Sequence, residues 1–149
     1  MTKQRGNTET LGLIALSGLF GLRVAGQALV SRGRAPFLPP MEQWQSGVLP
    51  YSALLASQGT ILAVQAVIDI QSLRGHGVFI TARPRLGRII HKISFAYFAS
   101  MVARYVVSMR RYPDRRWFGK TIPIVFHGLL ATYLFLYARL LTGADAKST

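Results

Sequence analysis

The stretch LGLIALSGLFGLRVAGQALVS, residues 11–31, is a long apolar run whose single charged residue is Arg23. A helix rises about 1.5 Å per residue, so about 20 mostly apolar residues cross the hydrocarbon core of a bilayer. Similar runs occupy residues 49–70, 89–109 and 121–141. Lipid offers no partner to unpaired backbone groups, and the runs lack the alternation typical of barrel strands. The sequence therefore predicts an all-α integral membrane protein, an antiparallel four-helix bundle.

The composition agrees with one membrane domain spanning residues 1–149. Half of the residues are hydrophobic, and the formal net charge is +13. The cations lie between the apolar runs, which favours contact with the lipid bilayer and its anionic lipids. We expect no nucleic-acid partner, because no zinc-finger or RNP-like pattern accompanies the charge. The absence of cysteine excludes disulfides and thiolate chemistry.

The connections between the runs carry helix-breaking residues, such as the pair Pro39 and Pro40 after the first run. Four crossings place both termini on one side of the membrane, side A, opposite side B. Side A has a slight excess of flanking cations, so the positive-inside rule puts it in the cytoplasm. We expect a bacterial inner membrane. Aromatic residues that favour the headgroup level gather near side B: Trp44, Tyr51, Tyr112, Trp117 and Phe118.

Each predicted helix contributes a polar residue to one layer. Helical rise puts Arg23, Gln58, Arg104 and His127 at roughly 18–22 Å from side A. Ionisable groups inside a spanning helix are costly and are therefore functional candidates. The layer has no carboxylate within reach, so its two guanidiniums need another form of compensation. Backbone carbonyls, lipid phosphate with water, or a bound anionic or carbonyl-bearing ligand would each supply it.

A second polar group is expected near side A, where Asp69 and Arg139 form a structural ion pair. A haem held by two histidines is not expected, because His91 and His127 lie roughly 18 Å apart along the membrane normal. A pigment or haem held by His127 or His91 alone stays open. His76 has too few acidic or histidine neighbours for a metal site, so we expect no metal and no cofactor.

Catalytic patterns are missing from the sequence. HExxH, GxSxG and a P-loop do not occur, and no pair of carboxylates lies inside the membrane runs. We therefore expect no enzyme. Small residues at four-residue spacing suggest close helix packing, and one such stripe, Ala96, Ser100 and Arg104, is expected to face the other helices.

Three stretches resemble a group of small, uncharacterised bacterial multipass membrane proteins. They are LPPMEQWQSGVLPYSALLASQ (residues 38–58), AYFASMVARY (residues 96–105) and WFGKTIPIVFHGLLA (residues 117–131). The shared pattern is a Leu-Pro-Tyr entry, a Met-x-x-Arg step and a Phe-His pair. The resemblance implies a four-helix membrane fold and no known activity. The matching positions are Pro50, Tyr51, Gln58, Met101, Arg104, Phe126 and His127.

Two functions fit these observations. The first is a non-catalytic accessory or structural subunit that contacts other membrane protein subunits of a larger complex. The alternative is a membrane binding or transport protein in which the layer holds an anionic lipid, a quinone or a small anion. In that case the ligand-binding residues are Arg23, Gln58, Arg104 and His127.

Overall fold

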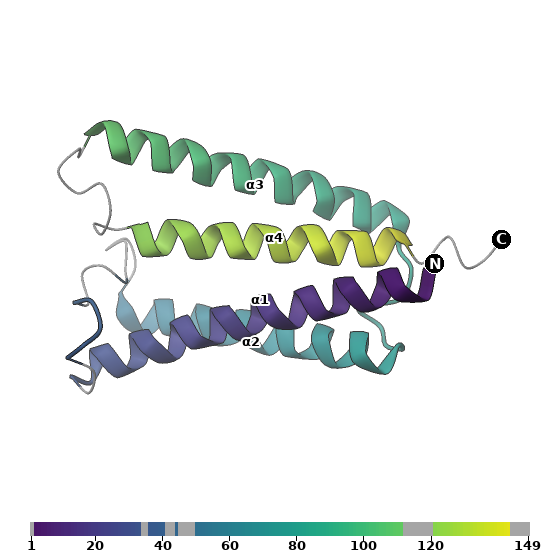
Figure 1. The fold of residues 1–149 in the computed structure, drawn as a ribbon, viewed down its shortest axis with the longest axis horizontal. Coiled ribbons are helices and arrows are strands. Elements are labelled where there is room, and N and C mark those ends of the chain that lie inside the picture. The colour runs from purple at the N-terminus through teal and green to yellow at the C-terminus, as the bar shows by residue number, and fades with distance from the viewer. Residues whose placement is uncertain (1, 34–35, 41–43, 45–49, 112–120, 144–149) are drawn as a thin grey trace.

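The computed structural model describes residues 2–33, 36–40, 44, 50–111 and 121–143, with side chains described for all of these except residues 2–6 and 121. This part of the chain contains α-helices and no strand, which confirms the predicted all-α class. The helices are α1 (Thr2–Ser31), α2 (Tyr51–Arg74), α3 (Pro84–Arg111) and α4 (Thr121–Gly143) (Figure 1).

The helices extend beyond the predicted apolar runs, above all at the start of α1. Backbone hydrogen bonding continues through polar residues outside the apolar stretch, so helix length exceeds the minimum needed to cross a bilayer. α2 stops at Gly75, whose φ of 72° is a left-handed conformation that glycine adopts without strain. α3 starts with Pro84, a residue that lacks the N–H group left unpaired in a first helical turn.

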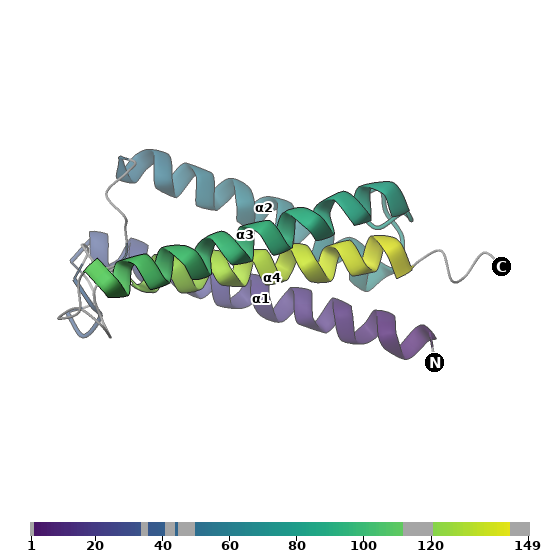
Figure 2. The same cartoon turned by 90° about the horizontal axis from the view of Figure 1, so that it is seen from above.

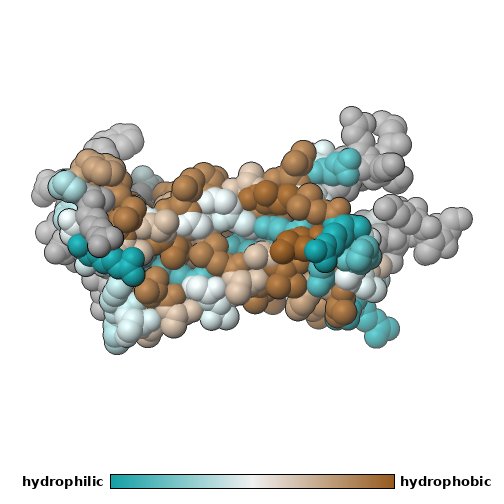
Figure 3. Space-filling view, turned by 90° about the horizontal axis from the view of Figure 1, so that it is seen from below, coloured by the Kyte–Doolittle hydropathy of each residue, from teal (hydrophilic) through white to brown (hydrophobic). Residues whose placement is uncertain are grey.

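Three helical segments of the described chain are long and apolar enough to cross a membrane: Asn7–Ser31, Tyr51–Arg74 and Ile122–Gly143. They indicate a membrane protein. α3 is long enough but is not among them. Its cations Arg85, Arg88, Lys92 and Arg104 lower its mean hydropathy. Figure 3 shows one face on which hydrophobic residues cover much of the surface and hydrophilic residues gather towards the two ends.

The four helices lie with their long axes roughly aligned (Figures 1 and 2). The start of α1 and the end of α4 lie at the same end of the molecule, which we call end A; the opposite end is end B. α4 packs extensively on α3 and also contacts α1, and α1 in turn contacts α2.

The apolar core lies in the half of the molecule nearer end A. Leu13 and Leu141 are fully buried there. α3 approaches α4 closely at Gly87, where a Cβ atom would stand 3.0 Å from the carbonyl oxygen of Ala138. The core cluster joins α1, α2 and α4 and consists of Leu13, Ile68, Tyr133, Tyr137 and Leu141.

Candidate functional site

Arg23 is buried, with 7% of its surface exposed. Its Nη2 donates a hydrogen bond of 3.0 Å to the carbonyl oxygen of Trp44, and its guanidinium carbon lies 5.3 Å from the centre of the Phe126 ring. Its Nε has no described hydrogen-bond partner. A backbone carbonyl and an aromatic face therefore offset this charge inside the molecule.

Trp44 reaches Arg23 because α1 has a glycine at the point of contact. A Cβ atom at Gly26 would lie only 3.0 Å from Cη2 of Trp44. The indole Nε1 donates to the carbonyl oxygen of Pro39 at 2.8 Å, which holds the ring in place. Of the aromatic residues expected at the headgroup level, Trp44 is buried beside the last turns of α1, and Tyr112, Trp117 and Phe118 lie outside the described residues.

Gln58 contacts a glutamine of the neighbouring helix. Its Nε2 donates to Oε1 of Gln27 at 3.1 Å, and both side chains are buried. Nε2 of Gln27 and Oε1 of Gln58 have no described partner. This pair links α1 to α2 inside the molecule.

His127 pairs with Tyr97, a residue that the sequence reasoning missed. The Tyr97 hydroxyl lies 2.5 Å from Nδ1 of the imidazole, and the two rings meet edge to face. Arg104 lies exposed on α3, close enough for its charge to act on both side chains. The Tyr97–His127 contact links α3 to α4.

The predicted layer thus divides into separate contacts. No described hydrogen bond joins any two of Arg23, Gln58, Arg104 and His127. Arg23 pairs with the first connection, Gln58 with α1 and His127 with α3. The structure gives Arg23, Gln58 and His127 three different polar partners.

The prediction that the stripe Ala96, Ser100 and Arg104 faces the other helices is wrong. All three residues are exposed. α3 turns a different side towards α4, and its buried residues are Gly87 and Ser94. Glycine and serine at that contact allow the close approach that we expected from the other stripe.

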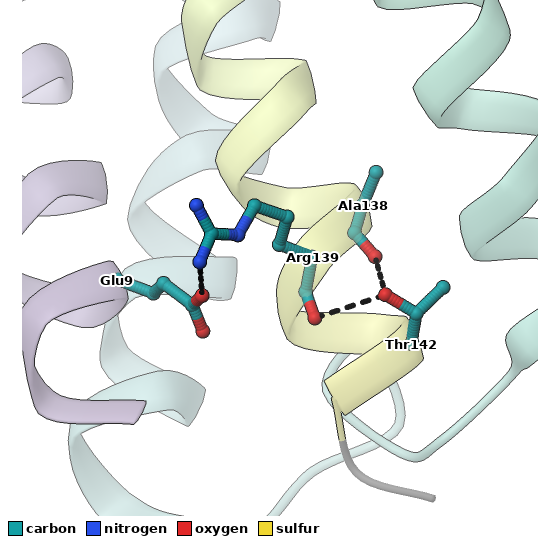
Figure 4. Close-up of polar contacts among 4 residues, drawn as sticks. All are labelled: Glu9, Ala138, Arg139 and Thr142. Atoms are coloured by element: carbon teal, nitrogen blue, oxygen red, sulfur yellow. Dashed lines mark hydrogen bonds and ion pairs between the residues drawn. The ribbon is translucent and has the colours of Figure 1, made fainter. Parts of the chain in front are cut away.

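The predicted ion pair between Asp69 and Arg139 is also wrong. Arg139 pairs instead with Glu9 of α1, with Nη2 and Oε1 3.0 Å apart (Figure 4). Asp69 is buried and accepts a hydrogen bond of 3.1 Å from the Tyr133 hydroxyl. The prediction failed because α1 begins at Thr2, which brings Glu9 into the helix beside α4.

An apolar groove lies between α2, α3 and α4. Its volume is about 550 Å³. Arg83, the residue that precedes α3, lines it where the second connection meets α4. The other lining residues are apolar or aromatic, apart from Thr60 and Gln65. The apolar and aromatic ones are Ile61, Val64, Ile68, Phe79, Leu86, Tyr97, Leu130, Tyr133, Leu134 and Tyr137. The sequence pattern did not reveal this groove, since it depends on how far α2 stands from α3.

The histidines show no sign of a shared metal. Among the described residues, no group of three or more His, Asp or Glu side chains is arranged to hold a metal ion. His91 packs its ring against Phe95 and Phe135, with ring centres 5.1 and 5.0 Å away.

Comparison with known proteins adds no relative. No family model, curated protein or solved structure matches the chain. The resemblance carried by the Leu-Pro-Tyr, Met-x-x-Arg and Phe-His motifs therefore stays a prediction.

Proposed function

We propose that the chain is a non-catalytic accessory subunit of a larger membrane complex, and that it crosses the bilayer as an antiparallel four-helix bundle. Three of the helices, α1, α2 and α4, contain segments long and apolar enough to cross a bilayer, which supports this proposal. α3 packs closely along α4 through Gly87, so it would share the same depth. Both termini would then lie on one side, in the cytoplasm of a bacterium, with the protein in the inner membrane.

The exposed Arg104 on α3 carries this proposal. It lies seven residues before the last residue of the helix, which is roughly 10 Å of helical rise from end B. Ala96, Ser100 and Val107 share its side of the helix by their three- and four-residue spacing, and all are exposed. A cation among lipid tails is costly, so a surface of this kind favours a protein partner.

The partner that fits this face is a membrane helix with a carboxylate at the depth of Arg104. The whole chain has five acidic residues. Glu9 pairs with Arg139, and Asp69 accepts from Tyr133. No described carboxylate pairs with Arg104. The small side chains of Ala96 and Ser100 would let a second helix approach closely.

Site-specific cross-linking tests the proposal. A photoreactive amino acid at Ser100 should join the chain to one protein in a fixed ratio, whereas the same amino acid at Leu22, an exposed position on α1, should not. Arg104→Leu should abolish the cross-link, and Arg104→Lys should keep it because the charge remains. Arg110→Leu, at an exposed position near the end of α3, is the matched control. A clean monomer in mild detergent, or equal yields from both positions, would overturn the proposal.

The second candidate function is the binding of a ligand by the predicted polar layer. The observation that favours it is the unpartnered Nε of the buried Arg23, together with the unpartnered Nε2 of Gln27, the residue whose Oε1 accepts from Gln58. An anionic lipid, a quinone or a small anion held by Arg23, Gln58, Arg104 and His127 would satisfy these atoms. Native mass spectrometry should then show a retained ligand that is lost in an Arg23→Leu, Arg104→Leu double variant. Unchanged retention would remove this candidate.

A further inference from the structure

The groove between α2, α3 and α4 has the size of a small-molecule site. Its volume of about 550 Å³ falls within the range of roughly 300–1,000 Å³ typical of such sites. On α2 it extends from Thr60 to Ile68, which corresponds to roughly 12 Å along the helix. Its walls are mostly apolar side chains from three helices, so its natural content is hydrocarbon.

One end of the groove carries a charge. Arg83 lies at end A, where its backbone N–H donates to the carbonyl oxygen of Leu141 at 3.3 Å. The Tyr137 hydroxyl donates to the carbonyl oxygen of Phe79 at 2.7 Å, which holds the second connection against α4. Arg83 is exposed, and no described carboxylate pairs with it. The backbone of this arginine is therefore held in position while its guanidinium is available to an anion.

The charge at the end of the groove favours a lipid over another occupant. An apolar helix, whether from a partner or from a second copy of this chain, would cover the walls but leave the Arg83 guanidinium without an anion. A free anion would use Arg83 but would leave the apolar walls uncovered.

We propose that this groove binds one acyl chain of an anionic phospholipid whose phosphate contacts Arg83. Arginine binds phosphate through a planar, charged donor pair, and the acyl chain would run inward from end A between α2 and α3. None of Arg23, Gln58 and His127 lines the groove, although its lining residue Tyr97 contacts His127. The site does not depend on the accessory-subunit proposal.

Native mass spectrometry of the full chain in detergent tests the site with two probes. Phosphatidylglycerol and phosphatidylcholine with identical acyl chains differ in net charge, so the anionic lipid should be retained about fivefold more. Arg83→Gln should reduce phosphatidylglycerol to the level of phosphatidylcholine. Arg85→Gln, an exposed cation two residues away that does not line the groove, should leave the preference unchanged.

A second pair of variants tests the acyl-chain site. Val64 lines the groove and is 47% exposed, whereas Val67 is 41% exposed and does not line it. Val64→Trp should fill the groove and remove both lipids, and Val67→Trp should not. Equal retention in the two tryptophan variants would overturn the proposal, as would an Arg83→Gln variant that keeps the lipid preference. A lipid-free dimer that Val64→Trp disrupts would show that a second copy occupies the groove instead.

Discussion

Arg23 on α1 donates a hydrogen bond of 3.0 Å to the carbonyl oxygen of Trp44, in the connection that leads to α2. A buried guanidinium needs compensation, and here a backbone oxygen supplies it together with the ring of Phe126. The contact also ties the first connection to the side of α1. The charge thus helps to hold Trp44 against α1.

Removing this donor should destabilise the protein. Arg23→Met keeps much of the apolar volume but leaves the Trp44 carbonyl without its donor, so we expect the free energy of unfolding in detergent to fall by about 0.5–2 kcal/mol. In a Trp117→Phe background, Trp44 fluorescence should also shift as the ring loses its burial. Arg32→Met, at an exposed position beyond the end of α1, is the matched control. Equal stability of the two variants would mean that the Trp44 contact contributes nothing.

The approach of α3 to α4 depends on Gly87. A Cβ atom there would stand 2.7 Å from Cγ2 of Thr142 and 3.0 Å from the carbonyl oxygen of Ala138. Because the backbone oxygen cannot move aside alone, Gly87→Ala should separate the helices and lower the free energy of unfolding by about 1–3 kcal/mol. Gly128→Ala has no atom within 4 Å of its new Cβ, so it should be neutral or stabilising. Thermal unfolding of both variants in one detergent checks the difference, and the reverse order of stability would refute this packing.

The helices were predictable because they depend on a local property of the chain. Runs of apolar residues long enough to cross a bilayer, bounded by residues such as Pro40 and Gly75, need no knowledge of tertiary contacts. The starts of α1 and α3 were less predictable. Nothing in an apolar run indicates how far the helix continues into polar residues, which is why the sequence missed the inclusion of Glu9 in α1.

The partners of the polar residues were not predictable for a different reason. Depth along a helix follows from helical rise, but the direction of a side chain around the helix depends on which faces pack together. Ala96, Ser100 and Arg104 form a stripe suited to packing, yet α3 packs through Gly87 and Ser94. Arg23 finds its acceptor in a connection, whose path no periodic pattern describes.

The Arg139 and Glu9 pair should contribute only modestly to stability. The Arg139 side chain is 37% exposed, and that of Glu9 is 11% exposed, so solvent weakens the attraction and we expect a coupling of about 0.2–1 kcal/mol. A double-mutant cycle with Glu9→Gln and Arg139→Met measures it, and the coupling should shrink as salt is added. The parallel cycle with Asp69→Asn and Arg139→Met should give no coupling. Coupling to Asp69 alone would restore the pairing that the sequence suggested.

The buried hydrogen bond between Tyr133 and Asp69 should contribute more to stability than the partly exposed pair of Arg139 and Glu9. Both residues are at least nine-tenths buried, and the Tyr133 hydroxyl also lies 3.4 Å from the carbonyl oxygen of Gln65, so this side chain links α4 to α2 at two points. Tyr133→Phe leaves the carboxylate without its donor inside the molecule, so we expect a loss of about 1–3 kcal/mol in the free energy of unfolding. Asp69→Asn keeps an acceptor for the hydroxyl and should be milder.

The matched control is Tyr105→Phe, because it removes the same hydroxyl group from an exposed position on α3. Chemical unfolding in detergent, followed by far-ultraviolet circular dichroism, compares the three variants. If Tyr133→Phe and Tyr105→Phe unfold at the same denaturant concentration, the hydroxyl of Tyr133 does not hold α2 to α4. In that case α2 and α4 are held together by the apolar contacts of Ile68 with Tyr133, Tyr137 and Leu141 in the core cluster.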